Sequence, residues 1–297
     1  MSDRTKLWKP ETHFDSQGDI LQDVTTAYSV FLEVCAASRY KAFVDRLAAD
    51  PDAARSEAAM SSWLRARRVA PSINETDTEG GMDFLCLSAD SPLLVEVTCL
   101  NKAAVVNKSG WPDTLDEIAQ TFTMITAQLA GKGQHKARQL STGQAGIPCV
   151  LVICLAHPGA SALLSTMAAE WLTVSDPKIK VPIVAQGTEL GQARLVTDLK
   201  RSVFFGPRDG AIVPMRESIS AILLVALWDR QLDVVGILHP QPTVPLNYRV
   251  FARVPFSRVE WPLMNPIEME WVIGDPGPLI AHHIKVALTD NELKGKQ

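Results

Sequence analysis

The sequence lacks the features that mark membrane, secreted and metal-stabilised proteins. No stretch approaches the run of about 18 apolar residues that crosses a bilayer. Residues 1–15 are polar and charged, without the apolar core of a secretory signal. The five cysteines lie mostly in apolar runs and form no C-x-x-C pair, which argues against a disulfide framework or a structural zinc site. We therefore expect a soluble, cytoplasmic protein with buried thiols and no membrane partner.

The chain also lacks an excess of basic charge. It has 29 Lys and Arg against 33 Asp and Glu, a net charge of −4. Nothing in this balance attracts nucleic acid to the whole protein, so such a partner must be held by a local patch. Apolar residues make up 46% of the 297 positions, enough to bury a substantial core.

Several common catalytic motifs are missing. The sequence has no G-x-S-x-G and no H-E-x-x-H, so serine hydrolase and zincin chemistry find no support. The segment Gly131-Lys132-Gly133 lacks the spacing and the following Ser or Thr of a P-loop. His282 and His283 are adjacent and point apart in a helix or strand, while the histidines at 135, 157 and 239 lack ligand spacing.

The most informative stretch is residues 80–98, two short apolar runs separated by turn residues. The first run carries Asp83 and the second carries Glu96. With the turn centred between residues 89 and 90, the two acids are cross-strand neighbours with β-carbons roughly 5 Å apart. Carboxylates that close need a cation or a proton between them. A one-residue bulge would turn one acid to the other face of the hairpin.

Other segments predict regular elements on both sides of this hairpin. Apolar spacing predicts helices and buried strands before and after it, and a second hairpin further on. Prolines after residue 239 are expected to preclude long regular elements, so that this segment wraps the surface or contacts a partner. The predicted helices are 23–47, 53–69, 115–140, 160–171 and 189–201; the predicted strands are 71–76, 148–155, 220–227 and 232–238, with a loop at 176–187.

The order of the central elements resembles the PD-(D/E)XK nuclease superfamily, which has the restriction-endonuclease-like fold. The resemblance covers roughly residues 53–156 and rests on Gly-Gly-Met-Asp83-Phe, on Leu-Leu-Val-Glu96-Val-Thr98, and on Lys136-Ala-Arg-Gln139 before a buried strand. It implies an α/β fold with a mixed central sheet flanked by helices. We expect one domain, with a helical N-terminal extension at 1–52, a nuclease-like core at 53–156, and accessory helices, an added hairpin and the proline-rich segment at 157–297.

The resemblance also implies a site. Asp83 and Glu96 match the acids that bind magnesium (or manganese), with Glu57 as a third acid from the preceding helix. Lys136 and Gln139 match positions on the following helix that often complete the catalytic site. Thr98 stands where the family has a lysine, so either another lysine supplies that charge or the site is weakened or silent.

The function that follows is metal-dependent hydrolysis of phosphodiester bonds in nucleic acid, DNA more than RNA. Its rivals are a catalytically silent module of the same fold that binds a protein partner or a second copy of itself, and an unrelated enzyme acting on a small phosphorylated molecule. The structural alternative treats both strand acids as solvent-facing strand ends and the basic run after the second helix as ordinary helix-end charge. The basic groups proposed to hold phosphate or to replace the missing lysine are Arg65, Arg67, Arg68, Lys102, Lys108, Lys132, Lys136 and Arg138.

Overall fold

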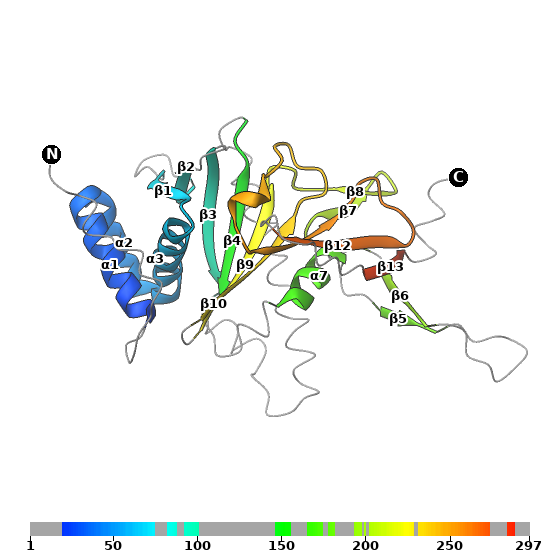
Figure 1. The fold of residues 1–297 in the computed structure, drawn as a ribbon, viewed down its shortest axis with the longest axis horizontal. Helices are drawn as coiled ribbons and strands as arrows, with labels where there is room; N and C mark the ends of the chain where they lie inside the picture. The colour runs from blue at the N-terminus through cyan, green and yellow to red at the C-terminus, as the bar shows by residue number, and fades with distance from the viewer. Residues whose placement is uncertain are drawn as a thin grey trace, which may run out of the picture.

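The protein is an α/β structure built on a large mixed sheet with helices packed against it (Figure 1). The computed structural model describes residues 20–74, 82–87, 92–100, 146–155, 165–174, 178–181, 193–197, 199, 202–228, 231–273 and 284–288. Eleven strands within these ranges hydrogen-bond in the order β1-β2-β3-β4-β9-β10-β11-β12-β13-β6-β5. No helix in the described ranges is long and apolar enough to cross a membrane.

Three helices precede the sheet: α1 (Ile20–Cys35), α2 (Ala37–Ala49) and α3 (Pro51–Ala66). The single helix predicted over 23–47 is therefore wrong, because the backbone leaves helical dihedrals at Ala36. Alanine favours helix, so local propensity gave no sign of this break. The break lets α2 fold back on α1, where the rings of Tyr28 and Phe43 meet edge to face with centroids 5.2 Å apart. The start of α3 follows the sequence signal, since the Asp50 side chain accepts a hydrogen bond from the Ala53 amide.

The predicted hairpin is confirmed. β1 (Ala70–Ile73), β2 (Phe84–Leu87) and β3 (Pro92–Leu100) are successive antiparallel neighbours, and β4 (Cys149–Leu155) pairs with β3 in parallel. In the hairpin Phe84 lies opposite Val95, the register expected from the turn position. All seven residues of β4 are buried, as expected for an interior strand with a layer on each face.

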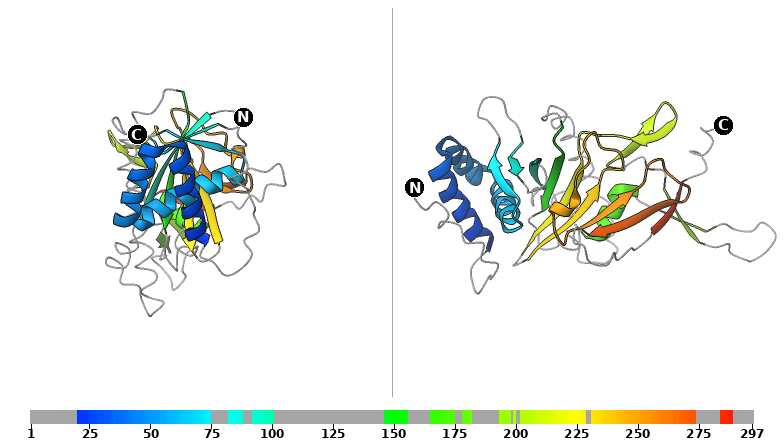
Figure 2. Two further views of the ribbon diagram at one scale, coloured as in Figure 1. Left: turned by 90° about the vertical axis from the view of Figure 1, so that its left-hand side faces the viewer. Right: turned by 45° about the horizontal axis from the view of Figure 1, so that its top comes forward.

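The strands around β4 present two differently covered faces. Val95 and Cys99 belong to a core cluster with residues of α1, α2 and α3, and we call this side the helical face. Leu94 and Leu100 belong to a second cluster with α7 (Thr166–Val174), and we call this side the α7 face. Figure 2 shows α1, α2 and α3 in front of the strands when the molecule is viewed from its N-terminal end. Side chains therefore alternate between two cores along each central strand.

The second half of the chain extends the sheet. The predicted hairpin of 220–227 and 232–238 is confirmed as an antiparallel pair beside β4. A separate two-stranded sheet follows α7 and β6 in the chain. The remaining elements are β5 (Lys178–Lys180), β6 (Arg194–Thr197), β7 (Phe205–Arg208), β8 (Ala211–Pro214), β9 (Ala221–Trp228), β10 (Gln231–Leu238), a 3₁₀ turn (Tyr248–Val250), β11 (Pro255–Val259), β12 (Ile267–Ile273) and β13 (Ile284–Leu288).

Three expectations for this half are wrong. The predicted helix 189–201 contains β6, and the predicted loop 176–187 contains β5; both strands depend on distant partners, since β6 pairs with β13 and β5 with β6. The segment after residue 239 does not simply wrap the surface, because it adds three strands to the large sheet; these strands are short, with five to seven residues each. Pro255 opens β11, and the prolines at 262 and 266 lie between β11 and β12. A proline at the start of a strand or between strands leaves the interior ladder hydrogen bonds intact.

Substitution of Gly236 tests the close contact between the parallel strands β10 and β11. Gly236 lies in register with Phe256, and a Cβ at this position would overlap the Phe256 ring. We expect Gly236→Ala to lower the free energy of unfolding by about 2 kcal/mol through overpacking, measured by denaturant titration. Gly206→Ala is the matched control, because its Cβ would meet only the flexible Met215 side chain at 3.2 Å. Equal stability losses in the two variants would contradict this explanation.

Candidate functional site

The two hairpin acids are both buried. Asp83 is 8% exposed and Glu96 is 4% exposed, so neither is a solvent-facing strand end. Continuing the hairpin register by one residue beyond the Phe84 and Val95 pair places Asp83 opposite Glu96. Both carboxylates that the sequence singled out are therefore buried at this end of the hairpin. A buried carboxylate is costly unless hydrogen bonds, cations or a proton compensate it.

Asp83 forms the junction between β2 and its two neighbours. Its Oδ2 accepts a hydrogen bond from the Val97 amide at 2.6 Å, and its main-chain oxygen accepts one from the Asn74 amide at 3.1 Å. Since β2 begins only at Phe84, the Asp83 carboxylate provides the acceptor beside β3 where the backbone ladder ends. This hydrogen bond fixes the Asp83 carboxylate at the main chain of Val97, the residue that follows Glu96 on β3.

Strand alternation is interrupted at Asp83. Met82 packs in the α7-face core and Phe84 in the helical-face core, although both are even-numbered. Register alone therefore does not set the direction of the Asp83 side chain. On β3, Glu96 lies between Val95 and Val97, which pack toward the helical face, so strand alternation directs Glu96 to the α7 face. Asp83 is thus at the edge of the hairpin and Glu96 is in its α7-facing row.

The Asp83 charge contributes to the pKa shifts of two groups on the helical face. Burial raises the pKa of Tyr28 well above its usual value, and the Asp83 charge adds to this effect. Burial also raises the pKa of the Cys154 thiol, with Asp83 among the smaller causes. Both side chains belong to the helical-face side of the sheet. Asp83 is therefore close enough to these two groups for its charge to influence their titration.

Glu57, the proposed third acid, is buried on α3 and is held by the N-terminal helices. The Tyr28 hydroxyl donates a hydrogen bond to its Oε1 at 2.8 Å, and Arg46 forms an ion pair with its Oε2. Because these partners come from α1 and α2, Glu57 joins three helices. Its metal-binding role stays a prediction, while its structural role is visible.

The arginines after α3 make contacts within the protein. Arg65 donates a hydrogen bond to the Pro71 carbonyl at 3.2 Å and lies over the Phe31 ring. Arg67 lies over the Trp63 ring, 3.9 Å from its centroid. Burial lowers the pKa of both guanidinium groups. Arg68 is exposed, whereas the other two arginines are half-buried.

The remaining predicted site residues divide into two groups. Thr98 is buried two residues beyond Glu96, in register with Ile153 of β4. The described ranges contain no cluster of three or more His, Cys, Asp or Glu side chains that would hold a metal ion. The predicted residues that lie outside the described ranges are Lys102, Lys108, Lys132, Lys136, Arg138 and Gln139.

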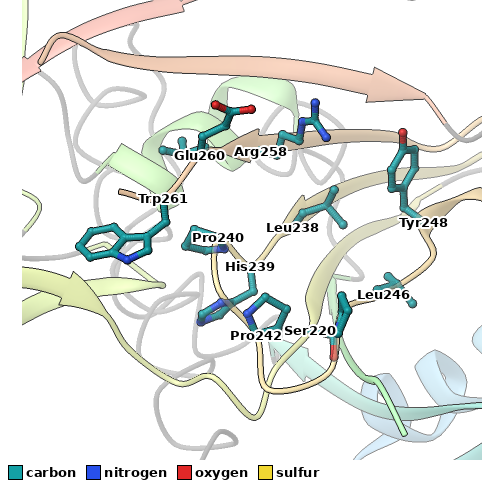
Figure 3. A pocket seen from close by; sticks show the side chains of 12 residues that line it. Ser220, Leu238, His239, Pro240, Pro242, Leu246, Tyr248, Arg258, Glu260 and Trp261 are labelled. Carbon is teal, nitrogen blue, oxygen red and sulfur yellow. The ribbon is translucent and has the colours of Figure 1, made fainter. Parts of the chain in front are cut away.

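A pocket that the sequence did not reveal lies at the carboxyl ends of β10 and β11. The two strands are parallel neighbours at Gly236 and Ile237, and beyond this point their chains separate around a cavity of about 540 Å³. Figure 3 shows Trp261 and Tyr248 on different sides of the pocket, with Leu238 and Pro240 between them. The available sequence signal was the combination of prolines and aromatic residues after residue 239. Binding sites in α/β proteins often lie outside the carboxyl ends of strands.

His239 fixes one wall of this pocket. Its Nδ1 accepts a hydrogen bond from the Gln241 amide at 2.9 Å, so Nε2 donates to the Met215 carbonyl at 2.8 Å. The Phe204 ring contacts the imidazole edge to face. Burial lowers the pKa of His239 to about 4, so the ring is neutral at pH 7. His239 therefore holds the loop that follows β10 rather than presenting a charge.

Comparisons with known proteins do not decide between the possible functions. No family model, curated protein or solved structure matches the chain. A function must therefore be inferred from the chemistry of the site residues.

Removal of the Tyr28 hydroxyl tests the link between α1 and Glu57. We expect Tyr28→Phe to lower the free energy of unfolding by about 2 kcal/mol, because Glu57 loses a buried hydrogen bond. Urea titration measures this loss. Tyr40→Phe is the matched control, since Tyr40 is a half-buried tyrosine on α2. Indistinguishable midpoints for the two variants would show that the hydrogen bond contributes little.

Acidification tests the lowered pKa of the buried His239 ring. Its pKa is about 4 in the folded protein and about 6.5 when unfolded, so the unfolded chain binds the extra proton first as the pH falls. As the pH falls from 6.5 to 4, protonation of His239 in the unfolded chain should therefore lower the free energy of unfolding by about 3 kcal/mol in total. His239→Gln keeps a hydrogen-bonding side chain without this titration. Its unfolding free energy, measured by urea titration at several pH values, should fall less steeply than that of the wild type; parallel curves would contradict the prediction.

Proposed function

We propose that the protein is a metal-dependent phosphodiesterase of the PD-(D/E)XK type that acts on nucleic acid, DNA more than RNA. The observation that carries this proposal is the pair of buried carboxylates, Asp83 directly before β2 and Glu96 within β3, each adjacent in sequence to the paired residues Phe84 and Val95. Apolar side chains would fill an interior strand at lower cost, so two acids at this place favour a chemical role.

The arrangement of the surrounding elements supports the part of this proposal that concerns the fold. Helix α3 precedes three antiparallel strands, and β4 then adds in parallel beside β3. These elements agree with the helix, short strand, hairpin and buried strand in the order that gave the resemblance to restriction-endonuclease-like proteins; the long helix of that order, predicted over 115–140, lies outside the described residues. The helices α1 and α2 and the strands from β9 onward are additions on either side of that unit.

The residues at the site fit a hard divalent cation in donor type. Asp83 and Glu96 would hold magnesium or manganese through carboxylate oxygens. When bound, such a cation stabilises the charge on the phosphoryl oxygens and lowers the pKa of a water ligand. The Val97 amide orients the Asp83 carboxylate, and the Thr98 hydroxyl offers a neutral hydrogen-bonding group where the family has a lysine. A lysine charge at the site would have to come from another position, with Lys102, Lys108 and Lys136 the candidates.

A second function, a catalytically silent binding module of the same fold, is favoured by a different set of contacts. Glu57 is engaged by Tyr28 and Arg46, and Arg65 and Arg67 stack on aromatic rings of the protein. The whole chain is acidic and position 98 is a threonine. In this alternative the accessory part of the chain would contact a protein partner or a second copy of the protein.

Charge removal at the two acids tests the nuclease proposal. In Asp83→Asn the side-chain oxygen can still accept from the Val97 amide, so the variant removes charge with little change in geometry. We expect Asp83→Asn and Glu96→Gln each to reduce cleavage of single-stranded or duplex DNA about 100-fold or more in magnesium or manganese. RNA is assayed in parallel, and the rates are measured on full-length protein.

Asp233→Asn is the control, because Asp233 is an exposed carboxylate on β10. It should cleave at the wild-type rate, and the melting temperatures of all variants should agree with that of the wild type. Absence of cleavage by the wild type on every substrate would favour the silent module. Cleavage that neither acid substitution reduces would contradict the assigned site.

A further inference from the structure

The pocket beyond β10 and β11 has the size and the lining of a small-molecule site. Its volume of about 540 Å³ falls within the range of about 300–1,000 Å³ that is usual for ligand pockets. Trp261 and Tyr248 are half-buried, so part of each ring faces solvent or a ligand. Leu238 and Pro240 lie between them and provide an apolar surface. The lining therefore suits a flat or aliphatic body.

Most polar groups of the lining already bond within the protein. The Ser220 hydroxyl donates to the Val244 carbonyl at 2.6 Å and accepts from the Cys149 amide. Both ring nitrogens of His239 are engaged, as described above. These groups shape the pocket and are poorly placed to select a ligand.

The charges of the lining favour a cation. The Arg258 guanidinium is ion-paired with Glu270, which lies opposite it in the β11 and β12 register. Glu260, two residues along the chain, is exposed and lines the same pocket. Figure 3 shows Glu260 and Arg258 near each other on one side of the pocket. With the Arg258 charge compensated by Glu270, the Glu260 carboxylate attracts positive charge and disfavours phosphate, and the lining also contains two aromatic rings that suit a cation.

We propose that this pocket binds a small organic cation, with its ammonium group at Glu260 and its apolar body between Trp261 and Tyr248. The ligand is an aromatic or aliphatic amine. The same chemistry occurs in a lysine side chain of a peptide, so the experiment includes both sources. This site is separate from the hairpin acids and does not depend on the proposed nuclease function.

Isothermal titration of the full-length protein with three indole compounds tests the proposal. Tryptamine, tryptophol and indoleacetate share the ring and differ in charge. We expect tryptamine to bind with a dissociation constant below about 1 mM and at least about tenfold more tightly than tryptophol, with no detectable binding of indoleacetate. A capped Gly-Lys-Gly peptide, which represents the protein source, should bind more weakly than tryptamine.

Two variants locate the binding. Glu260→Gln and Trp261→Leu should each weaken tryptamine binding about tenfold, while Glu33→Gln, an exposed glutamate on α1, should leave it unchanged. Glu260 is exposed, so its substitution tests the site even where Trp261→Leu fails to fold. Three results would overturn the proposal: no tryptamine binding, equal binding of tryptophol, or unaltered binding to Glu260→Gln. Binding of the peptide without tryptamine would overturn the small-molecule assignment.

Discussion

Burial of β4 on both faces is the constraint on which the rest of the structure depends. Every side chain of this strand is out of solvent, and its parallel neighbour β9 is buried over residues 221–227 as well. Two adjacent strands of this kind need an apolar layer on each side of the sheet. The N-terminal helices supply one layer, and α7 with part of the later sheet supplies the other. The helices before residue 52 are therefore part of the core and are more than an extension attached to it.

This layered burial determines what the hairpin acids can do. β3 lies next to β4, so a carboxylate in the middle of β3 is surrounded by apolar side chains unless it is at an edge or at an interruption in the ladder. The Asp83 carboxylate stands at such an interruption, where β2 begins one residue late and the Val97 amide needs an acceptor. Glu96 lies beside it in a regular strand. Asp83 therefore completes the ladder at this point, and Glu96 places a second buried carboxylate at the neighbouring strand position.

Local pattern predicted the parts of the fold whose cause is local. The turn residues and alternation at 83–98 predicted the hairpin register, and the uninterrupted apolar run at 148–155 predicted β4. Ala36 gave no signal, because its conformation follows from packing of α2 on α1. β6 likewise follows from pairing with β13. Burial of the two acids was anticipated from their apolar neighbours, but the irregular alternation around Asp83 required the positions of Met82 and Phe84 in opposite cores.

The pocket and the hairpin acids occupy different parts of one sheet. β4 and β9 lie between β3 and β10 in the strand order, which separates the two places by three strand spacings, roughly 14 Å. The pocket also lies at strand ends, while Glu96 is within a strand. Coupling between two sites requires an element with two arrangements that both sites influence. The intervening strands are buried over residues 149–155 and 221–227 and are paired with each other, and such close packing resists gradual deformation. The proposed cation beyond β10 should therefore leave the surroundings of the two hairpin acids unchanged, and each place has to be explained by its own residues.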